Sequence, residues 1–173
     1  THASTTDPDA RLYKKAKGRQ AQLCYMGHAL MENRNGLVIA TRVTSANGTA
    51  ERDAAVDMLE HIPGNHRITL GGDKGYDCAD FVGQCRDLKT TAHVARKQKG
   101  SGIDGRTTRH EGYQVSLRIR KRIEEVFGWL KTIGGLGKLH HRGRNRVDAV
   151  FTFAAAAYNL IRIRNLTASA EGG

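Results

Sequence analysis

A small set of charged side chains has the residue types and spacing of a ligand-binding site. Arg120, Glu124 and Lys131 lie in a stretch whose apolar residues recur at helical intervals. At about 100° per residue, these three side chains fall within roughly 40° of one another, in a polar line beside the apolar stripe. The same spacing also fits an ordinary ion pair between Arg120 and Glu124, which are four residues apart.

Asp73 is the carboxylate that could complete a site with them. Residues 67–72 predict a short strand, and Asp73 follows it directly, before the tight turn Lys74-Gly75-Tyr76. Open α/β sheets place ligand sites at this carboxyl end of their strands. Asp73 could equally cap the helix that comes next, and the residues alone leave both interpretations open.

The elements that would position these side chains follow from periodicity and turn residues. In chain order, we expect a polar loop at 1–19, strands at 22–32 and 37–43, a helix at 50–61, a strand at 67–72, a helix at 77–88, a strand at 91–95, a basic loop at 96–115, and helices at 116–133 and 145–165. The turn Asn33-Arg34-Asn35-Gly36 makes the first two strands an antiparallel hairpin. The strands at 67–72 and 91–95 are expected to be parallel. This order predicts an α/β fold in a single domain, 1–173.

Two helices carry the predicted core. The helix at 116–133 has an apolar stripe made of Ile119, Ile123, Val126, Phe127, Leu130 and Ile133. The helix at 145–165 is apolar around most of its circumference, which predicts that it is buried.

Positive charge is concentrated in one part of the chain. The whole sequence has 28 Lys+Arg against 17 Asp+Glu, a net charge of +11. Between Arg96 and Arg146 there are 14 basic and 4 acidic residues, whereas the remainder is nearly neutral. Such a concentration opposes compaction by self-repulsion and favours a polyanionic partner. A solvated face or a ribosome-like contact surface is the alternative interpretation.

Other classes of protein are disfavoured. The cysteines Cys24, Cys78 and Cys85 are odd in number and lack a C-x-x-C pair, which argues against a disulfide framework and a zinc site. No apolar run reaches the roughly 18 residues of a membrane span. We therefore expect a cytoplasmic protein. The first residue, Thr1, is not an initiator Met, so we also expect a piece of a longer chain.

Residues 70–77, LGGDKGYD, and 120–131, RKRIEEVFGWLK, resemble the DDE transposases of bacterial insertion sequences, and the resemblance runs over about residues 1–166. In that family an Arg lies four residues before the catalytic Glu and a Lys seven residues after it. Arg120, Glu124 and Lys131 match this spacing. The neighbouring Glu125 does not, because Lys121 and Thr132 stand at the corresponding positions.

The resemblance implies an RNase H-like mixed sheet flanked by helices and a site for two divalent ions, Mg²⁺ or Mn²⁺. Asp73 and Glu124 would be metal ligands, because close carboxylates need cations to neutralise them. Two such ions assist in-line displacement at phosphorus, by which DNA is nicked and joined. Arg120 and Lys131 would hold phosphates, and Tyr76 matches the family's aromatic residue after the second Asp.

The implied partner is DNA, as transposon ends and target, and a homodimer is compatible with the resemblance. The expected DNA contacts are Lys74, Tyr76, Arg142, Arg144 and Arg146. In the cell this would place the protein at the bacterial nucleoid.

The sequence departs from the family pattern at two places. Leu117 stands where a Tyr is usual, three residues before the Arg. The first catalytic Asp belongs on a central strand upstream of the hairpin, and neither Asp7 nor Asp9 lies in an apolar strand. We therefore expect a domain truncated at its N-terminus, without its central first strand, and a chain that is inactive and aggregation-prone alone. The alternative function is a non-catalytic, basic nucleic-acid-binding domain.

Overall fold

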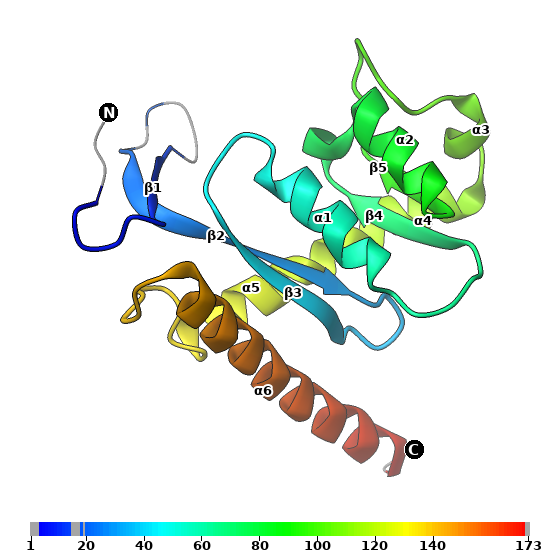
Figure 1. Ribbon diagram of the computed structural model, residues 1–173. Coiled ribbons are helices and arrows are strands. Elements are labelled where there is room, and N and C mark those ends of the chain that lie inside the picture. Colours follow the sequence, from blue (N-terminus) through cyan, green and yellow to red (C-terminus); the bar gives the residue numbers. More distant parts are fainter. Residues whose placement is uncertain (1–3, 15–17, 19, 172–173) are drawn as a thin grey trace. The chain divides into compact units, whose positions relative to one another are not determined.

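The computed structural model describes residues 4–14, 18 and 20–171 (Figure 1). The chain divides into two compact units. The first unit comprises residues 1–55 and 123–173, and the second comprises residues 56–122. Helix α1, Ala50–Glu60, runs through the boundary between them. None of the helices in the described residues is both long and apolar enough to cross a membrane.

The first unit is built on an antiparallel sheet in the order β1-β2-β3. Its strands are β1, Arg11–Tyr13, β2, Gln22–Met31, and β3, Val38–Ser45. The predicted hairpin is confirmed: β2 pairs with β3 from Tyr25↔Ser45 to Met31↔Val38, with an irregularity at Leu30/Met31. The expectation that 1–19 is entirely loop is wrong, because Arg11–Tyr13 pairs with the start of β2. Residues 1–3, 15–17 and 19 of that expected loop lie outside the described residues.

Two helices pack with this sheet in the first unit, α5, Ile123–Thr132, and α6, Arg144–Glu171. Their shared core consists of Val38, Val43, Val126, Leu130, Val147, Phe151, Ala154 and Ala155. Polar side chains of α6 also bind the main chain of β3. The amide of Asn159 exchanges hydrogen bonds with the N–H and C=O of Val38, and Asp148 accepts one from the N–H of Val43. These bonds satisfy main-chain groups that a strand edge would otherwise leave unpaired.

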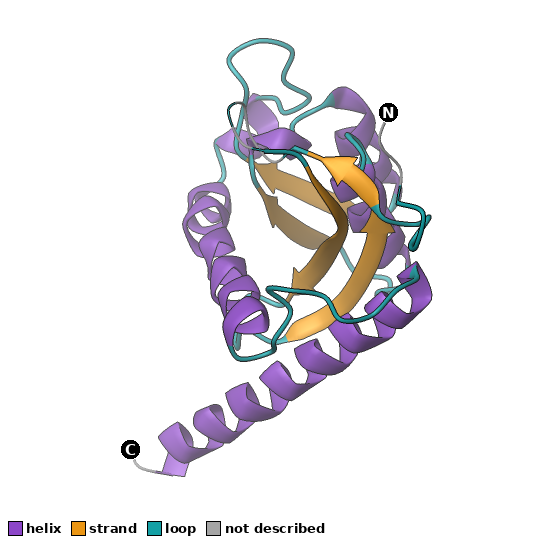
Figure 2. Ribbon diagram, turned by 90° about the vertical axis from the view of Figure 1, so that its left-hand side faces the viewer, coloured by secondary structure: helices purple, strands orange, loops and turns teal. Residues whose placement is uncertain are grey.

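The expectation that the last helix is buried around its circumference is wrong. Helix α6 is longer than predicted, and its C-terminal turns continue past the hairpin (Figures 1 and 2). Phe153 is 78% exposed and Leu160 is 70% exposed, because only one face of the helix meets β3. Ile133, placed in the apolar stripe of the preceding helix, is 70% exposed because it lies beyond the end of α5.

The second unit contains a parallel pair of strands and the helices around it (Figure 1). Its elements are β4, Ile68–Gly72, the 3-10 turn η1, Lys74–Tyr76, α2, Ala79–Asp87, β5, Thr90–Val94, α3, Gly105–Thr108, α4, Glu111–Ile119, and the 3-10 turn η2, Arg120–Arg122. Strands β4 and β5 pair from Ile68↔Thr90 to Gly72↔Val94, which confirms the predicted parallel pair. Helix α2 packs on β5, and α4 contacts both strands.

Two expectations for this region are wrong. The segment 96–115 is not all loop, because α3 and the first half of α4 lie in it. Tyr113 anchors α4: its side chain is buried and its hydroxyl donates to the C=O of Val94 at 2.9 Å. The predicted continuous helix 116–133 is interrupted by η2 between α4 and α5. The chain is thus a mixed α/β protein with one antiparallel and one parallel set of strands.

Candidate active site

Asp73 combines the two roles that its sequence context allowed, at the end of a strand and at the start of a helical turn. It is the first residue after β4, and it is also the N-cap of η1. Its side chain is exposed, and Oδ1 accepts a hydrogen bond from the N–H of Gly75 at 2.7 Å. Among the described residues, Oδ2 has no hydrogen-bond partner. One carboxylate oxygen therefore orders the turn while the other is available to a ligand.

The glycines before Asp73 allow close packing around the end of β4. A Cβ on Gly72 would lie 2.9 Å from Cγ1 of Val94 on the paired strand. A Cβ on Gly71 would lie 3.4 Å from Cβ of Arg120 and 3.5 Å from the C=O of Ser116. A Cβ at position 71 would thus make only ordinary contacts, and these distances place Arg120 next to the strand that ends at Asp73.

Arg120 itself has an unusual environment. Its Nε is buried and has no hydrogen-bond partner in the part of the chain that the structure describes. A buried donor without an acceptor costs free energy, so this Nε is an unsatisfied group at the end of β4. Because η2 is a 3-10 turn, the regular helical spacing between Arg120 and Glu124 that the sequence suggested does not hold.

Glu124 and Lys131 lie on α5 in the first unit, and both side chains are exposed. Seven residues fall about 20° short of two turns, so the two side chains share one face of α5. Val126 and Leu130 lie on the opposite face of α5, where they are buried in the core of the first unit. Glu125 is exposed as well, so exposure alone does not separate it from Glu124.

The convergence of Asp73 and Glu124 stays a prediction, since Asp73 belongs to the second unit and Glu124 to the first. Among the described residues there is no group of three or more His, Cys, Asp or Glu side chains that could hold a metal ion. The two carboxylates nevertheless fit Mg²⁺ or Mn²⁺ in donor type, because these hard cations prefer oxygen ligands.

The two acidic residues near the N-terminus have partners within the first unit. Asp7 Oδ1 accepts from the hydroxyl of Tyr25 at 2.6 Å and from the N–H of Gly143 at 3.3 Å. Asp9 Oδ2 accepts from the N–H of Arg144, the first residue of α6, at 3.1 Å. Burial and the Asp7 carboxylate raise the pKa of the Tyr25 hydroxyl. These contacts give both carboxylates a structural role at the start of α6, where negative charge is favourable.

The expected DNA contacts are placed on several elements. Lys74 is exposed on η1, whereas Tyr76 is half-buried with its ring centroid 5.2 Å from that of Phe81. Arg142 lies in the loop before α6, and Arg144 and Arg146 lie in its first turn. All three arginines are exposed. The ring packing indicates that Tyr76 contributes to the core of the second unit.

Sequence reasoning missed the role of Asp77, which it placed at the start of the helix expected at 77–88. The N-cap of α2 is Cys78, and Asp77 is fully buried (0% exposed). Its Oδ2 accepts from the N–H of Lys97 at 2.6 Å, and its Oδ1 accepts from the N–H of Gly102 at 2.8 Å. Burial alone would raise the pKa of this carboxyl, but hydrogen bonds from the 97–103 loop hold it below its usual value. No local sequence signal marks such a contact, because its partners are main-chain groups about twenty residues away.

The chain matches the family model of the transposase DDE domain over residues 1–160. Comparisons with curated proteins and with solved structures gave no match.

Proposed function

This chain belongs to the transposase DDE domain family, and we propose that it supplies part of an active site that cuts and joins DNA strands in transposition. The observation that carries the proposal is the end of β4. There, Asp73 has an available carboxylate oxygen, and Arg120, with an unpaired buried Nε, lies against the same strand.

In the proposed site, Asp73 and Glu124 bind divalent cations, Mg²⁺ or Mn²⁺. When bound, a pair of such ions would activate an attacking hydroxyl and stabilise the leaving oxygen at phosphorus. Arg120 donates to a phosphate oxygen through its guanidinium, which suits the planar geometry of phosphate recognition. Lys131 shares the face of Glu124 on α5 and adds a second positive charge toward the DNA.

The proposed architecture is RNase H-like, with the first catalytic Asp on a further strand. Over Tyr25–Met31 the edge of β2 opposite β3 has no partner strand among the described residues, since β1 pairs only with Gln22, Leu23 and Cys24. Such an edge is a place where a further strand could pair. We propose that residues 1–173 alone are marginally stable and inactive. A soluble, cooperatively unfolding 173-residue chain that cleaves DNA with Mg²⁺ would overturn this part of the proposal.

The test is substitution of the two carboxylates in the full-length chain. Asp73→Asn and Glu124→Gln should each lower the rate of Mg²⁺-dependent strand cleavage and joining by about 100-fold or more, because several kcal/mol of transition-state stabilisation are lost. The affinity for duplex DNA should stay within about twofold, since phosphate contacts dominate it.

Glu125→Gln is the matched control, because it removes an equally exposed carboxylate from the next position of α5. It should retain activity. Loss of activity in Glu125→Gln together with full activity in Glu124→Gln would contradict the assignment.

A non-catalytic nucleic-acid-binding domain is the second candidate, and the concentration of positive charge between Arg96 and Arg146 favours it. In that case Asp73→Asn and Glu124→Gln would leave the affinity for DNA unchanged, and the unsubstituted chain would have no cleavage activity to lose. Removal of basic side chains alone would then impair the protein.

A further inference from the structure

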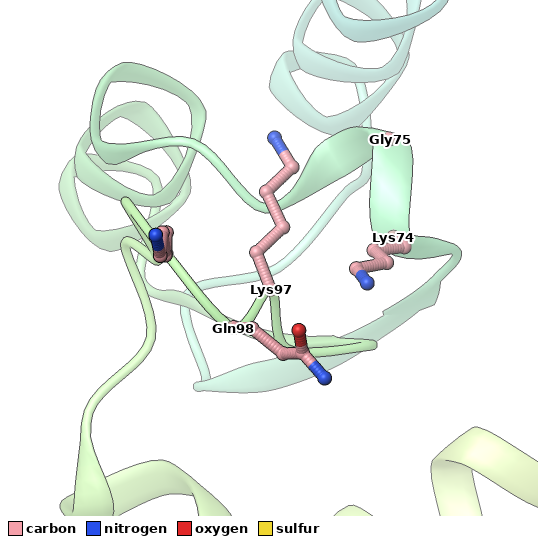
Figure 3. Close-up of a pocket in the computed structure, with 5 residues that line it drawn as sticks. Lys74, Gly75, Lys97 and Gln98 are labelled. Atoms are coloured by element: carbon pink, nitrogen blue, oxygen red, sulfur yellow. The ribbon is translucent and has the colours of Figure 1, made fainter.

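A recess of about 550 Å³ opens beside the turn that follows β4 (Figure 3). Lys74 and Gly75 line it from η1, and Lys97, Gln98 and Lys99 line it from the segment after β5. All of these residues belong to the second unit. The recess therefore lies at the carboxyl ends of two parallel strands, where α/β sheets place their ligands.

The three lysines give the recess a net positive charge, although the carboxylates of Asp73 and Asp77 lie close to them in the chain. Across the ranges that the structure describes, no carboxylate forms an ion pair with Lys74, Lys97 or Lys99. Asp73 is the nearest acidic neighbour in the chain, and its Oδ1 is bound to the N–H of Gly75. Three ammonium groups around one opening repel each other, so an anion between them would be stabilised.

The two walls of the recess are tied together by Asp77. This buried carboxylate follows η1 directly and binds the N–H groups of Lys97 and Gly102. The loop that carries Lys97 and Lys99 is thereby held next to Lys74 before any ligand arrives. Such preorganisation reduces the entropy that binding would otherwise cost.

The chemistry of the lining distinguishes between anionic ligands. Lysine carries a compact point charge that can bind a phosphate oxygen without the bidentate geometry of arginine. The described lining contains lysine, glycine and glutamine, and it offers no aromatic ring on which a base could stack. This composition favours a phosphodiester backbone over a nucleotide or an aromatic small molecule.

We propose that this recess binds the phosphodiester backbone of DNA beside Asp73, through Lys74, Lys97 and Lys99. The inference rests on the proposed function, because it takes DNA as the partner. It adds a binding subsite made by the 97–99 segment, separate from Arg120 and Lys131. Asp73 stands one residue before Lys74, so a strand held by these lysines would pass close to it.

The test is a fluorescence anisotropy titration of labelled duplex DNA at several salt concentrations, with the full-length chain. Lys97→Gln/Lys99→Gln should reduce the affinity by about tenfold per lysine near 0.1 M salt. It should also reduce the slope of log K against log salt by about 0.9 for each phosphate that is no longer neutralised. The loss should be the same for DNA of unrelated sequence, because backbone contacts carry no sequence information.

A control of equal charge is available at the opposite end of the same strands. Arg67 precedes β4 and Lys89 precedes β5, and both are exposed. Arg67→Gln/Lys89→Gln should change the affinity by less than about twofold, since the lost charges do not contact phosphate. Lys97→Arg/Lys99→Arg should restore binding. The single Lys99→Gln changes an exposed position, and it tests the recess if the double variant folds poorly.

The outcomes separate this inference from the proposed function. Unchanged affinity and salt slope in Lys97→Gln/Lys99→Gln, or equal losses in the control, would overturn the recess as a DNA subsite. Absence of DNA binding by the unsubstituted chain would do the same. Weak binding in the lysine variant together with full activity in Asp73→Asn would instead support the recess and reject the catalytic proposal.

Discussion

The ring of Phe151 lies directly against the main chain of Gly27. Its Cε2 is 2.8 Å from the position that a Cβ at residue 27 would occupy, closer than real Cβ atoms approach a neighbour. Phe151 belongs to the buried cluster that joins α6 to the hairpin. The absence of a side chain at Gly27 is therefore what allows α6 to lie this close to β2.

Gly27→Ala should destabilise the protein by about 1–3 kcal/mol, because the added methyl group overpacks a filled core. The measurement is the free energy of unfolding from urea titration. Gly83→Ala is the matched control, since Gly83 lies within α2 and a methyl group there would have nothing within 4 Å. It should raise stability by about 0.5–1 kcal/mol through helix propensity. Equal stabilities for the two variants would contradict the packing described for Phe151.

Protonation of His28 should destabilise the fold as the pH falls. Burial lowers the pKa of this ring to about 4, and its Nε2 lies 2.8 Å from Oγ1 of Thr44. In the unfolded chain the pKa is near 6.5, so the unfolded state binds more protons between these two values. The contribution of His28 is thus fully present above about pH 6.5 and lost as the pH falls to about 4, on the order of 3 kcal/mol.

Urea midpoints measured across this pH range check the prediction. His28→Gln should flatten the dependence, leaving a smaller slope from His93, whose pKa burial also lowers. An unaltered slope in His28→Gln would show that another group titrates.

Asp77→Ala should release the loop after β5. The substitution leaves the N–H groups of Lys97 and Gly102 without their acceptor, at a cost of about 2–4 kcal/mol. Trypsin should then cut at Lys97 and Lys99 faster than in the unsubstituted chain. Asp80→Ala, at an exposed position of α2, should not accelerate this cleavage. Because the folded pKa of Asp77 is depressed, its contribution is present above about pH 4 and lost in more acidic solution.

The arginines at the start of α6 should serve DNA binding rather than folding. The first turn of α6 contains Arg144 and Arg146 and no acidic residue, although the positive end of a helix dipole disfavours cations. Arg142→Glu/Arg146→Glu should therefore leave the melting temperature unchanged or higher. It should weaken duplex DNA binding by at least about tenfold near 0.1 M salt. A parallel loss of stability and affinity would indicate a structural role for these side chains instead.

Local signals in the sequence predicted the elements that local interactions determine. Alternating apolar residues and the turn at Asn33-Arg34-Asn35-Gly36 gave the hairpin, and the strand ending at Gly72 placed Asp73 correctly. The first half of helix α4 was missed because its buried anchor, Tyr113, stands in a stretch rich in glycine and arginine. Its partner is the C=O of Val94, which periodicity cannot reveal.

The exposed face of α6 and the role of Asp77 escaped prediction for a similar reason. The apolar side chains of Phe153 and Leu160 suggested that the helix is buried on this side as well. The position of β3 decides which face is covered, and these two side chains lie outside it. The predicted site stays a prediction. Asp73 and Arg120 are brought to the same strand end, whereas η2 breaks the helical spacing that linked Arg120 to Glu124.

The carboxylate of Asp77 recognises amide groups that every amino acid except proline possesses. Residue 97 can consequently change its side chain, and with it the local charge, while the loop keeps its shape. Position 102 lacks this freedom, because a Cβ there would lie 2.8 Å from the carbonyl of Cys78. Evolution could thus adjust the affinity of this loop for a polyanion at one position while the path of the chain remains anchored at the other.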